Sequence, residues 1–153
     1  MSSQSIRLVD EAATARLGVA VATTLCVGEA VCLSGSLGAG KSTLARALIR
    51  ALTTPEEEVP SPTFTLVQTY DAAGFALAHF DLYRLSDPDE IYELGLEEAL
   101  DGGAAIIEWP ERLEGRLPGD RLDIEIDFEA DGGRVARLNP HGAWEGRAIE
   151  FNT

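Results

Sequence analysis

The chain has 153 residues, which is enough for one compact domain with its own core, and we expect a single domain over residues 1–153. Its 12 basic residues stand against 26 acidic ones, and the formal charge of -14 argues against tight direct binding of RNA or DNA, because such binding depends on Lys and Arg. Gly18, Gly28 and Glu29 interrupt the apolar stretch 17–33, and the N-terminus lacks a secretory pattern, so we expect a cytoplasmic protein with no membrane span.

The first third of the chain alternates between strands and helices. Residues 6–9 are typical of a short strand, and Asp10 is a good N-cap for a helix that ends near Gly28. Apolar residues at four-residue spacing indicate one buried face on this helix: Ala13, Leu17, Val21 and Leu25. Residues 30–33 are typical of a buried strand. The core stripe of the helix that follows consists of Leu44, Leu48, Ala51 and Leu52.

The sequence contains two cysteines, Cys26 near the end of a predicted helix and Cys32 in a predicted strand. Neither has the spacing of a metal-ligand pair, and no histidine lies near them in the sequence. We expect both to be reduced thiols in the core.

The rest of the chain continues the alternation. In chain order, its predicted elements are a polar connection over 53–62, strands over 64–70 and 75–80, a helix from its N-cap Asp87 to Leu94, and strands over 104–107, 122–128 and 134–138. The connection is longer than most loops in α/β units and is the best candidate for a mobile segment. The continuously apolar strand 104–107 should lie in the sheet centre, whereas alternation in 122–128 indicates an edge. From Asn139 to Thr153 little specifies structure, and 139–153 is expected to be a weakly specified tail.

Residues Gly35 to Ser42 match the phosphate-binding motif G-x-x-x-x-G-K-[ST] between a predicted strand and a predicted helix. Glycines let backbone N–H groups turn toward phosphate oxygens at the start of a helix, whose dipole favours anions. Lys41, the only lysine in the chain, would reach the β- and γ-phosphates of a nucleoside triphosphate, and the Ser42 hydroxyl would ligate Mg²⁺. The candidate nucleotide-binding residues of the loop are Ser36, Leu37, Gly38, Ala39, Gly40, Lys41, Ser42 and Thr43. The pattern predicts an α/β protein with the three-layer P-loop NTPase fold around a central mixed, mainly parallel sheet.

Nucleotide hydrolysis also needs a carboxylate near the phosphates, and two acids follow predicted strands. Asp81 ends the strand 75–80 and Glu108 ends the strand 104–107, so both could converge on the glycine loop at the carboxyl edge of the sheet. We favour Glu108 for Mg²⁺, because its strand is more continuously apolar, and give Asp81 the role of orienting water or supporting the metal indirectly. The opposite assignment stays open.

Several further segments accompany the glycine loop. They are Ser61 to Val67 (S-P-T-F-T-L-V), His79 to Leu85 (H-F-D-L-Y-R-L), Leu94 to Leu96 (L-G-L) and Ile107 to Pro110 (I-E-W-P). Together with Gly38 to Thr43, this set resembles the TsaE (YjeE) family over residues 5–138. The resemblance implies a small ATPase that binds ATP and Mg²⁺ and works with TsaB and TsaD in forming threonylcarbamoyladenosine on tRNA. The tRNA is then expected to be held through the complex rather than by this chain.

The resemblance also implies roles for individual residues. The phosphate and metal contacts come from Lys41, Ser42 and Thr43, the active-site side chains are Asp81, Glu108 and Trp109, and the residues beside the adenine are Glu11 and Thr14. Thr63 falls in a switch-like loop after the polar connection, where its hydroxyl could meet the γ-phosphate or Mg²⁺. His79 is interpreted as structural. Ser36 stands where the family commonly has an acid, which leaves any catalytic role for that side chain open.

Two other functions remain compatible with the sequence. A small-molecule kinase would transfer the γ-phosphoryl group to an alcohol and usually carries arginines on a lid, for which Arg112 and Arg116 are candidates. A nucleotide switch would use slow hydrolysis to time its contacts with partners. The sequence has no N-K-x-D guanine motif, which disfavours a GTPase, but an ATP-dependent switch within a complex stays open.

Overall fold

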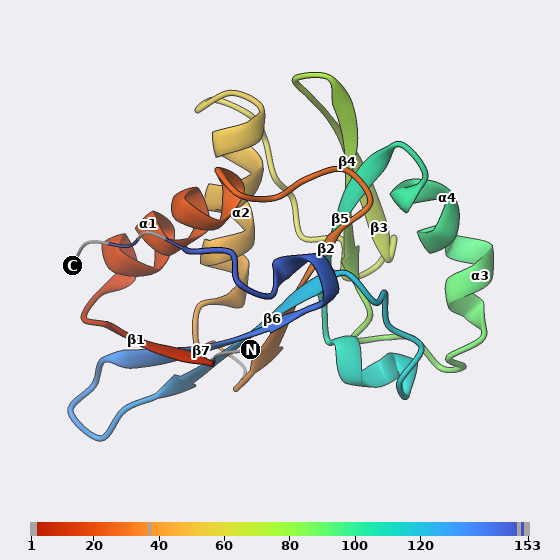
Figure 1. Ribbon diagram of the computed structural model, residues 1–153. Helices are drawn as coiled ribbons and strands as arrows, with labels where there is room; N and C mark the ends of the chain where they lie inside the picture. Colours follow the sequence, from red (N-terminus) through yellow and green to blue (C-terminus); the bar gives the residue numbers. More distant parts are fainter. Residues whose placement is uncertain (1–2, 37, 150, 152–153) are drawn as a thin grey trace.

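The computed structural model describes residues 3–36, 38–149 and 151, and its elements can be followed in Figure 1. The strands are β1 (Gln4–Leu8), β2 (Ala30–Gly35), β3 (Val67–Ala72), β4 (Phe75–Asp81), β5 (Gly103–Glu108), β6 (Arg121–Phe128) and β7 (Arg134–His141). The helices are α1 (Glu11–Ala22), α2 (Lys41–Leu52), α3 (Glu90–Leu94), α4 (Leu96–Leu100) and the short 3-10 helices η1 (Pro110–Leu113) and η2 (Gly142–Trp144). Within the described ranges, no helix is both long enough and apolar enough to cross a bilayer.

The strands form a 7-stranded sheet in the order β1-β7-β6-β2-β5-β4-β3. Its middle strands β6, β2, β5 and β4 run parallel, whereas β7, β1 and β3 join by antiparallel pairing. The predicted α/β fold, with a mixed sheet that is parallel in its centre, is therefore confirmed. The predicted central position of β5 is also confirmed, because it pairs with β2 on one side and β4 on the other and is buried throughout.

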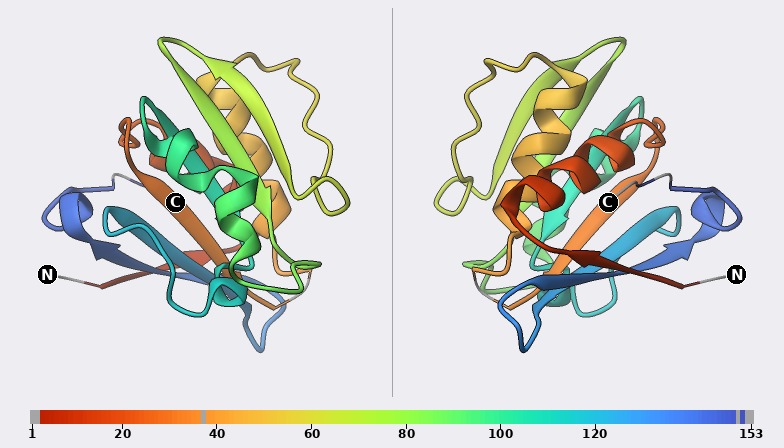
Figure 2. Two further views of the ribbon diagram at one scale, coloured as in Figure 1. Left: turned by 90° about the vertical axis from the view of Figure 1, so that its right-hand side faces the viewer. Right: turned by 90° about the vertical axis from the view of Figure 1, so that its left-hand side faces the viewer.

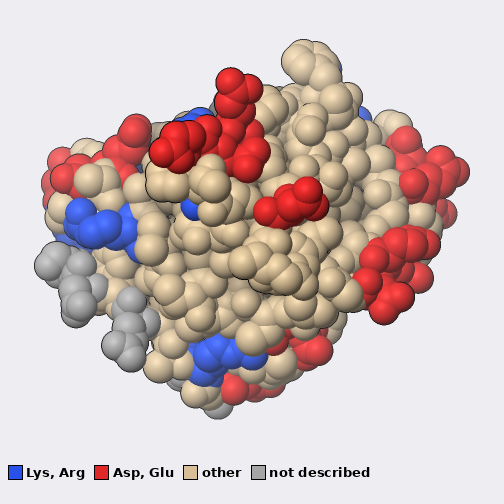
Figure 3. Space-filling view, turned by 90° about the horizontal axis from the view of Figure 1, so that it is seen from above, with Lys and Arg blue, Asp and Glu red and all other residues tan. Residues whose placement is uncertain are grey.

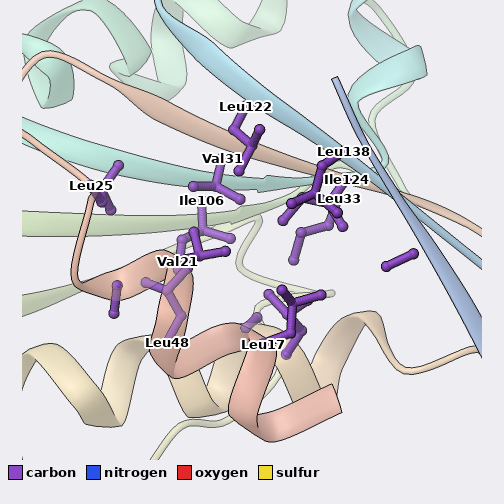
Figure 4. Packing of buried hydrophobic residues seen from close by; sticks show 14 of the residues in the cluster. Leu17, Val21, Leu25, Val31, Leu33, Leu48, Ile106, Leu122, Ile124 and Leu138 are labelled. Atoms are coloured by element: carbon purple, nitrogen blue, oxygen red, sulfur yellow. The ribbon is translucent and has the colours of Figure 1, made fainter. Parts of the chain in front are cut away.

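Helices cover the two faces of the sheet. Figures 1 and 2 show α1 and α2 against one face and α3 and α4 against the other. The alternation of side chains along β2 serves both layers: Val31 and Leu33 belong to the core with α1 and α2, whereas Cys32 belongs to the core with α3 and α4. In Figure 4, Leu17 and Val21 of α1 point toward the sheet residues of the first core. The molecule is thus a three-layer α/β sandwich.

The position predicted for the strand 122–128 is wrong. β6 is not at an edge, since it pairs in parallel with β2 and antiparallel with β7, and the edge strands are β1 and β3. Its alternation is real, with Leu122, Ile124 and Ile126 buried against α1 and α2. The polar residues between them, such as Glu125, face the side that α3 and α4 leave uncovered beside β6. One open face, rather than an edge position, produces the alternating pattern.

The first helix begins as predicted and ends earlier. The Asp10 carboxylate accepts a hydrogen bond from the backbone N–H of Ala13 (2.8 Å), which confirms the N-cap. At the other end, the hydroxyl groups of Thr23 and Thr24 donate to backbone carbonyls one turn back (2.7 and 2.9 Å), and such bonds compete with continuation of the helix. Leu25 is buried beyond the helix end, in the connection to β2.

The core assignments need two corrections. Cys26 is exposed after the early end of α1, so only Cys32 is a core thiol as expected. In α2, Leu44 and Leu48 are fully buried, but Ala51 is exposed. Ile49 is buried instead, because the face of α2 that packs against α1 and the sheet contains Ile49 and not Ala51.

Residues 64–66 do not join β3, which starts at Val67 rather than at Phe64. Residues 63–65 form a turn instead, and Leu66 has a positive φ of 69°, which no strand residue adopts. Helix α3 begins at Glu90, although Asp87 accepts from the N–H of Asp89 (3.0 Å) as a cap would. The first turn after Asp87 is closed by i to i+3 bonds, so the regular helix starts later.

The described residues beyond Asn139 pack against the sheet, although their sequence specifies little. β7 continues to His141, and the 3-10 helix η2 follows with Trp144 fully buried. Arg147 then forms a bidentate ion pair with Glu29, at 2.7 and 2.8 Å, directly before β2. Contacts with residues more than 100 positions away therefore hold this segment.

Candidate functional site

The glycine loop connects β2 to α2, at the carboxyl end of a central strand. Gly35 has a φ of 123°, and a Cβ there would lie 2.0 Å from the carbonyl oxygen of Ile126, so only glycine fits beside β6. Gly40 has a φ of 120° and caps α2 without a side-chain hydrogen bond, which leaves the first N–H groups of the helix for an anion. Leu37, one of the predicted phosphate contacts, lies outside the described residues.

Lys41 is held inside the loop. Its Nζ donates to the carbonyl oxygens of Gly35 (2.7 Å) and Ser36 (3.3 Å) and lies 4.2 Å from the centre of the Trp109 ring. The residue is 5% exposed. Burial lowers the pKa of its ammonium group, and nearby acids, Glu108 foremost, act against that shift. A concentrated, partly desolvated positive charge thus lies at the start of α2.

Asp81 and Glu108 are neighbours at the ends of two parallel strands. They are paired residues of β4 and β5, and Glu108 is in turn paired with Leu33 of β2, two residues before the glycine loop begins. Both acids are buried. The predicted convergence of these carboxylates on the glycine loop therefore follows from strand order, since β5 lies next to β2 and β4 is one strand further away.

The two carboxylates have different partners. Asp81 accepts from the Thr63 hydroxyl and from the backbone N–H of Tyr83, both at 3.0 Å, so each of its oxygens has a donor. Glu108 has one oxygen, Oε2, 2.6 Å from Nε2 of His79, while Oε1 has no hydrogen-bond partner among the described residues. Glu108 is therefore the acid with an uncommitted oxygen.

Thr63 reaches Asp81 from the loop that precedes β3. Its hydroxyl oxygen also lies 2.7 Å from the hydroxyl oxygen of Ser61, so Ser61, Thr63 and Asp81 form a chain of hydrogen bonds. The loop is joined to β4 by the backbone, because the N–H of Asp81 donates to the carbonyl of Leu66 (3.0 Å). The Thr63 hydroxyl thus contacts Asp81, and its role in a switch-like loop stays a prediction.

Trp109 follows Glu108 in a left-handed backbone conformation, with φ of 61°. Its N–H donates to the carbonyl of Leu33 (3.2 Å), which continues the pairing of β5 with β2. The indole ring lies 4.9 Å from the Tyr83 ring at a tilt of 50°, and it faces the ammonium group of Lys41. An aromatic wall thus closes the lysine side of the site.

These side chains surround a cavity of about 370 Å³. It is lined by Gly38, Gly40, Lys41, Ser42, Thr43, Ser61, Thr63, Asp81, Tyr83, Glu108 and Trp109. Ser61 and Tyr83 were not singled out from the sequence, although both lie inside the motifs that carry the family resemblance. The size of the cavity and the charged and hydroxyl groups in its lining fit a phosphate group and its counter-ion.

The remaining predicted residues lie in other hollows. Glu11, Thr14 and Ala39 line a second hollow of about 120 Å³ on the α1 side of the loop, where Arg134 donates to the Ala39 carbonyl (3.1 Å). Ser36 donates to Asp127 of β6 (3.1 Å) and lines a third hollow. Nothing in the sequence around Arg134 indicated its contact with the loop, since the two residues are 95 positions apart.

The donor set fits a metal ion that shares its coordination with phosphate oxygens. No group of three or more His, Cys, Asp or Glu side chains in the described part of the chain could hold a metal alone. Mg²⁺ commonly takes one or two carboxylates, substrate phosphates and water. A hydroxyl at Ser42 and a free carboxylate oxygen on Glu108 beside one cavity meet that requirement.

The two arginines considered for a kinase lid have other contacts. Arg112 lies 5.6 Å from the centre of the Tyr83 ring, and Arg116 pairs with Asp89 at 3.1 Å. Among the described residues that line the cavity, none is an arginine.

The three-layer fold, with a glycine loop between a central strand and a helix that starts with lysine, defines a P-loop NTPase fold. The crystal structure of Bacillus subtilis YdiB has this architecture with a TM-score of 0.73 and 26% sequence identity, over 92% of this chain and 87% of that one. The sequence profile of the family "Threonylcarbamoyl adenosine biosynthesis protein TsaE" matches residues 8–136. The chain belongs to the TsaE family.

Relatives with the name "tRNA threonylcarbamoyladenosine biosynthesis protein TsaE" cover most of the chain. The protein from Rickettsia bellii is 40% identical over 138 residues, which are 90% of this chain and 95% of that protein. The protein from Nostoc sp. is 38% identical over 140 residues, 88% of this chain and 85% of its own length. The resemblance carried by the sequence motifs is confirmed.

Proposed function

We propose that this chain is a cytoplasmic, Mg²⁺-dependent ATPase that supports threonylcarbamoyladenosine modification of tRNA together with TsaB and TsaD. The observation that carries the proposal is the gathering of Lys41, Thr63, Asp81 and Glu108 around one cavity at the start of α2. Membership of the TsaE family supplies the pathway.

The cavity residues suggest a division of work. Lys41 and the first N–H groups of α2 neutralise the β- and γ-phosphates, with Ser36, Leu37, Gly38, Ala39, Gly40 and Thr43 contributing the rest of the cradle. Ser42 and the free oxygen of Glu108 would hold Mg²⁺, and the ion would supply positive charge against the negative charge of the phosphates. Asp81 accepts from Thr63, and this pair orients the attacking water.

The nucleoside end lies on the other side of the glycine loop. Glu11 and Thr14 border the second hollow, which shares Gly38, Gly40 and Thr43 with the phosphate cavity. Trp109 stays with the phosphates, where its ring contacts Lys41. The adenine therefore lies between α1 and the loop, and the indole ring serves to place the lysine.

The chain alone is expected to hydrolyse ATP slowly and to bind tRNA only through its partners. No arginine is among the described residues that line the cavity. In many enzymes that transfer phosphoryl groups, an arginine stabilises the negative charge of the transition state. The surface is strongly acidic: Figure 3 shows separate groups of acidic side chains on one face, including one on the side of α3 and α4, with few basic ones. Such a surface repels a phosphate backbone.

The test is phosphate release with and without TsaB, TsaD and tRNA. We expect slow release by the chain alone, faster release in the complex, and loss of both in Lys41→Ala and in Lys41→Arg, whose planar guanidinium is longer than the ammonium group. Circular dichroism should show both variants folded. Turnover by Lys41→Ala at the parental rate would exclude the cavity as the site, and phosphorylation of an added alcohol in place of phosphate release would favour a kinase.

A further inference from the structure

We infer that His79 is a positioning residue that sets the orientation of the Glu108 carboxylate toward the cavity. The inference rests on the proposed function and adds a residue to it. His79 Nε2 lies 2.6 Å from Glu108 Oε2, and both side chains are almost completely buried. No other described side chain contacts this carboxylate by a hydrogen bond.

Strand pairing brings the two residues together. His79 is paired with Ile106 of β5, two positions before Glu108, so the two side chains stand on the same face of adjacent parallel strands. The contact links residues 29 positions apart. It joins the interior of β4 to the acid at the end of β5.

The surroundings of the ring fix the direction of the hydrogen bond. His79 Nδ1 is buried without a partner among the described residues, so a proton on Nδ1 alone would leave one N–H unsatisfied. It would also set the lone pair of Nε2 against the carboxylate oxygen. The proton therefore belongs on Nε2, which donates to Glu108.

This bond decides which oxygen faces the cavity. With Oε2 committed to His79, the carboxylate cannot rotate freely, and Oε1 remains for a ligand. Buried donors of this kind, behind a metal-binding group, typically change metal affinity or activity by about 10- to 100-fold when they are removed. Asp81 has its own donors in Thr63 and Tyr83, so a change at His79 should act on Glu108 alone.

The experiment measures the affinity of the isolated full chain for a fluorescent ATP derivative over a series of Mg²⁺ concentrations. His79→Leu removes the donor at similar volume, whereas His79→Gln places an amide N–H near the position of Nε2. His141→Leu is the matched control, because it removes the only other histidine, which pairs with Asp123 at 2.9 Å on the surface.

Mg²⁺ should enhance the affinity of the parent for the ATP derivative. We expect His79→Leu to raise the Mg²⁺ concentration that gives half of this enhancement by about 10- to 100-fold, and to leave the affinity for the derivative in the absence of Mg²⁺ unchanged. His79→Gln should restore most of the loss, and His141→Leu should match the parent. In a Glu108→Gln background, His79→Leu should have no further effect. If His79→Leu does not fold, His79→Asn, whose amide is too short to reach Glu108, takes its place.

The outcomes separate the two proposals. A parent protein whose nucleotide affinity does not depend on Mg²⁺ overturns the proposed function. A parent that depends on Mg²⁺, with the same Mg²⁺ requirement in His79→Leu, overturns the positioning role alone. An equal loss in the parental and Glu108→Gln backgrounds also overturns it, because the effect would then not pass through Glu108.

Discussion

The ion pair between Arg147 and Glu29 allows a quantitative test of how the C-terminal segment is held. Arg147 binds both carboxylate oxygens of Glu29, at 2.7 and 2.8 Å, and Glu29 is 5% exposed. In Arg147→Met, the N–H of Cys26 is the one donor left to the carboxylate among the described residues. Breaking a buried pair from one side costs about 3–5 kcal/mol. Because the Arg147 side chain is 23% exposed, we expect the low end, about 3 kcal/mol.

Urea and thermal unfolding followed by circular dichroism measure this cost. For a chain of this length, about 3 kcal/mol lowers the melting temperature by roughly 6–12 °C. Arg137→Met is the control, because Arg137 pairs with Glu125 and Asp127 on the surface and should cost at most about 1 kcal/mol. Adding Glu29→Met removes the isolated charge and should regain part of the loss. Equal losses in the two arginine variants, or a double variant no more stable than Arg147→Met, would refute the reasoning.

Three further predictions concern the cavity and the cysteines. Glu108→Gln should weaken Mg²⁺-dependent nucleotide binding more than Asp81→Asn does. Asp81→Asn should chiefly slow hydrolysis, by about 100-fold or more. Mg²⁺ titrations of nucleotide affinity and measurements of phosphate release in both variants check this order, and the reverse order would exchange the roles of the two acids. Burial lowers the pKa of Lys41 from 10.5, so between the two pKa values the unfolded chain binds more protons at this site and stability rises with pH. The stability of the parent relative to Lys41→Met should therefore increase as the pH rises toward 10.5, and a constant difference would contradict this prediction. Exposed Cys26 should react with a thiol reagent in the native protein. Cys32 should react only on unfolding, because it is buried and burial raises the pKa of its thiol. Mass spectrometry that finds both cysteines modified under native conditions would contradict this prediction.

Local chemistry made the position of the glycine loop, between a strand and a helix, predictable. The glycine loop, Lys41 and Ser42 lie within eight consecutive residues, and their backbone requirements can be read from residue types alone. The approach of Asp81 to Glu108 was predictable for a related reason, since parallel strands end at one edge of a sheet. Neither inference needs the packing of distant segments.

The features that sequence reasoning missed depend on distant contacts. The alternation of β6 is the same for an edge strand and for an interior strand with one open face, so only its pairing with β2 and β7 distinguishes them. Trp144 gave no local signal of burial, because its place is set together with the ion pair of Arg147 to Glu29, 118 positions away. The bond of His79 to Glu108 likewise needs the register of two strands.

Two residues beside Asp81 and Glu108 have an unusual backbone conformation, and both help to position side chains of the candidate site. Leu66 and Trp109 have positive φ angles of 69° and 61°, a conformation that costs non-glycine residues about 1–3 kcal/mol unless the surroundings impose it. Leu66 is held because its carbonyl accepts from the N–H of Asp81, and this contact brings Thr63 onto the same aspartate. Trp109 is held by its bond to Leu33, which sets the indole ring over Lys41. Sequence patterns predict secondary structure for an unstrained backbone, so they extend β3 back through residues 64–66. In the structure the chain turns there instead, and the turn places the Thr63 hydroxyl against the buried carboxylate of Asp81.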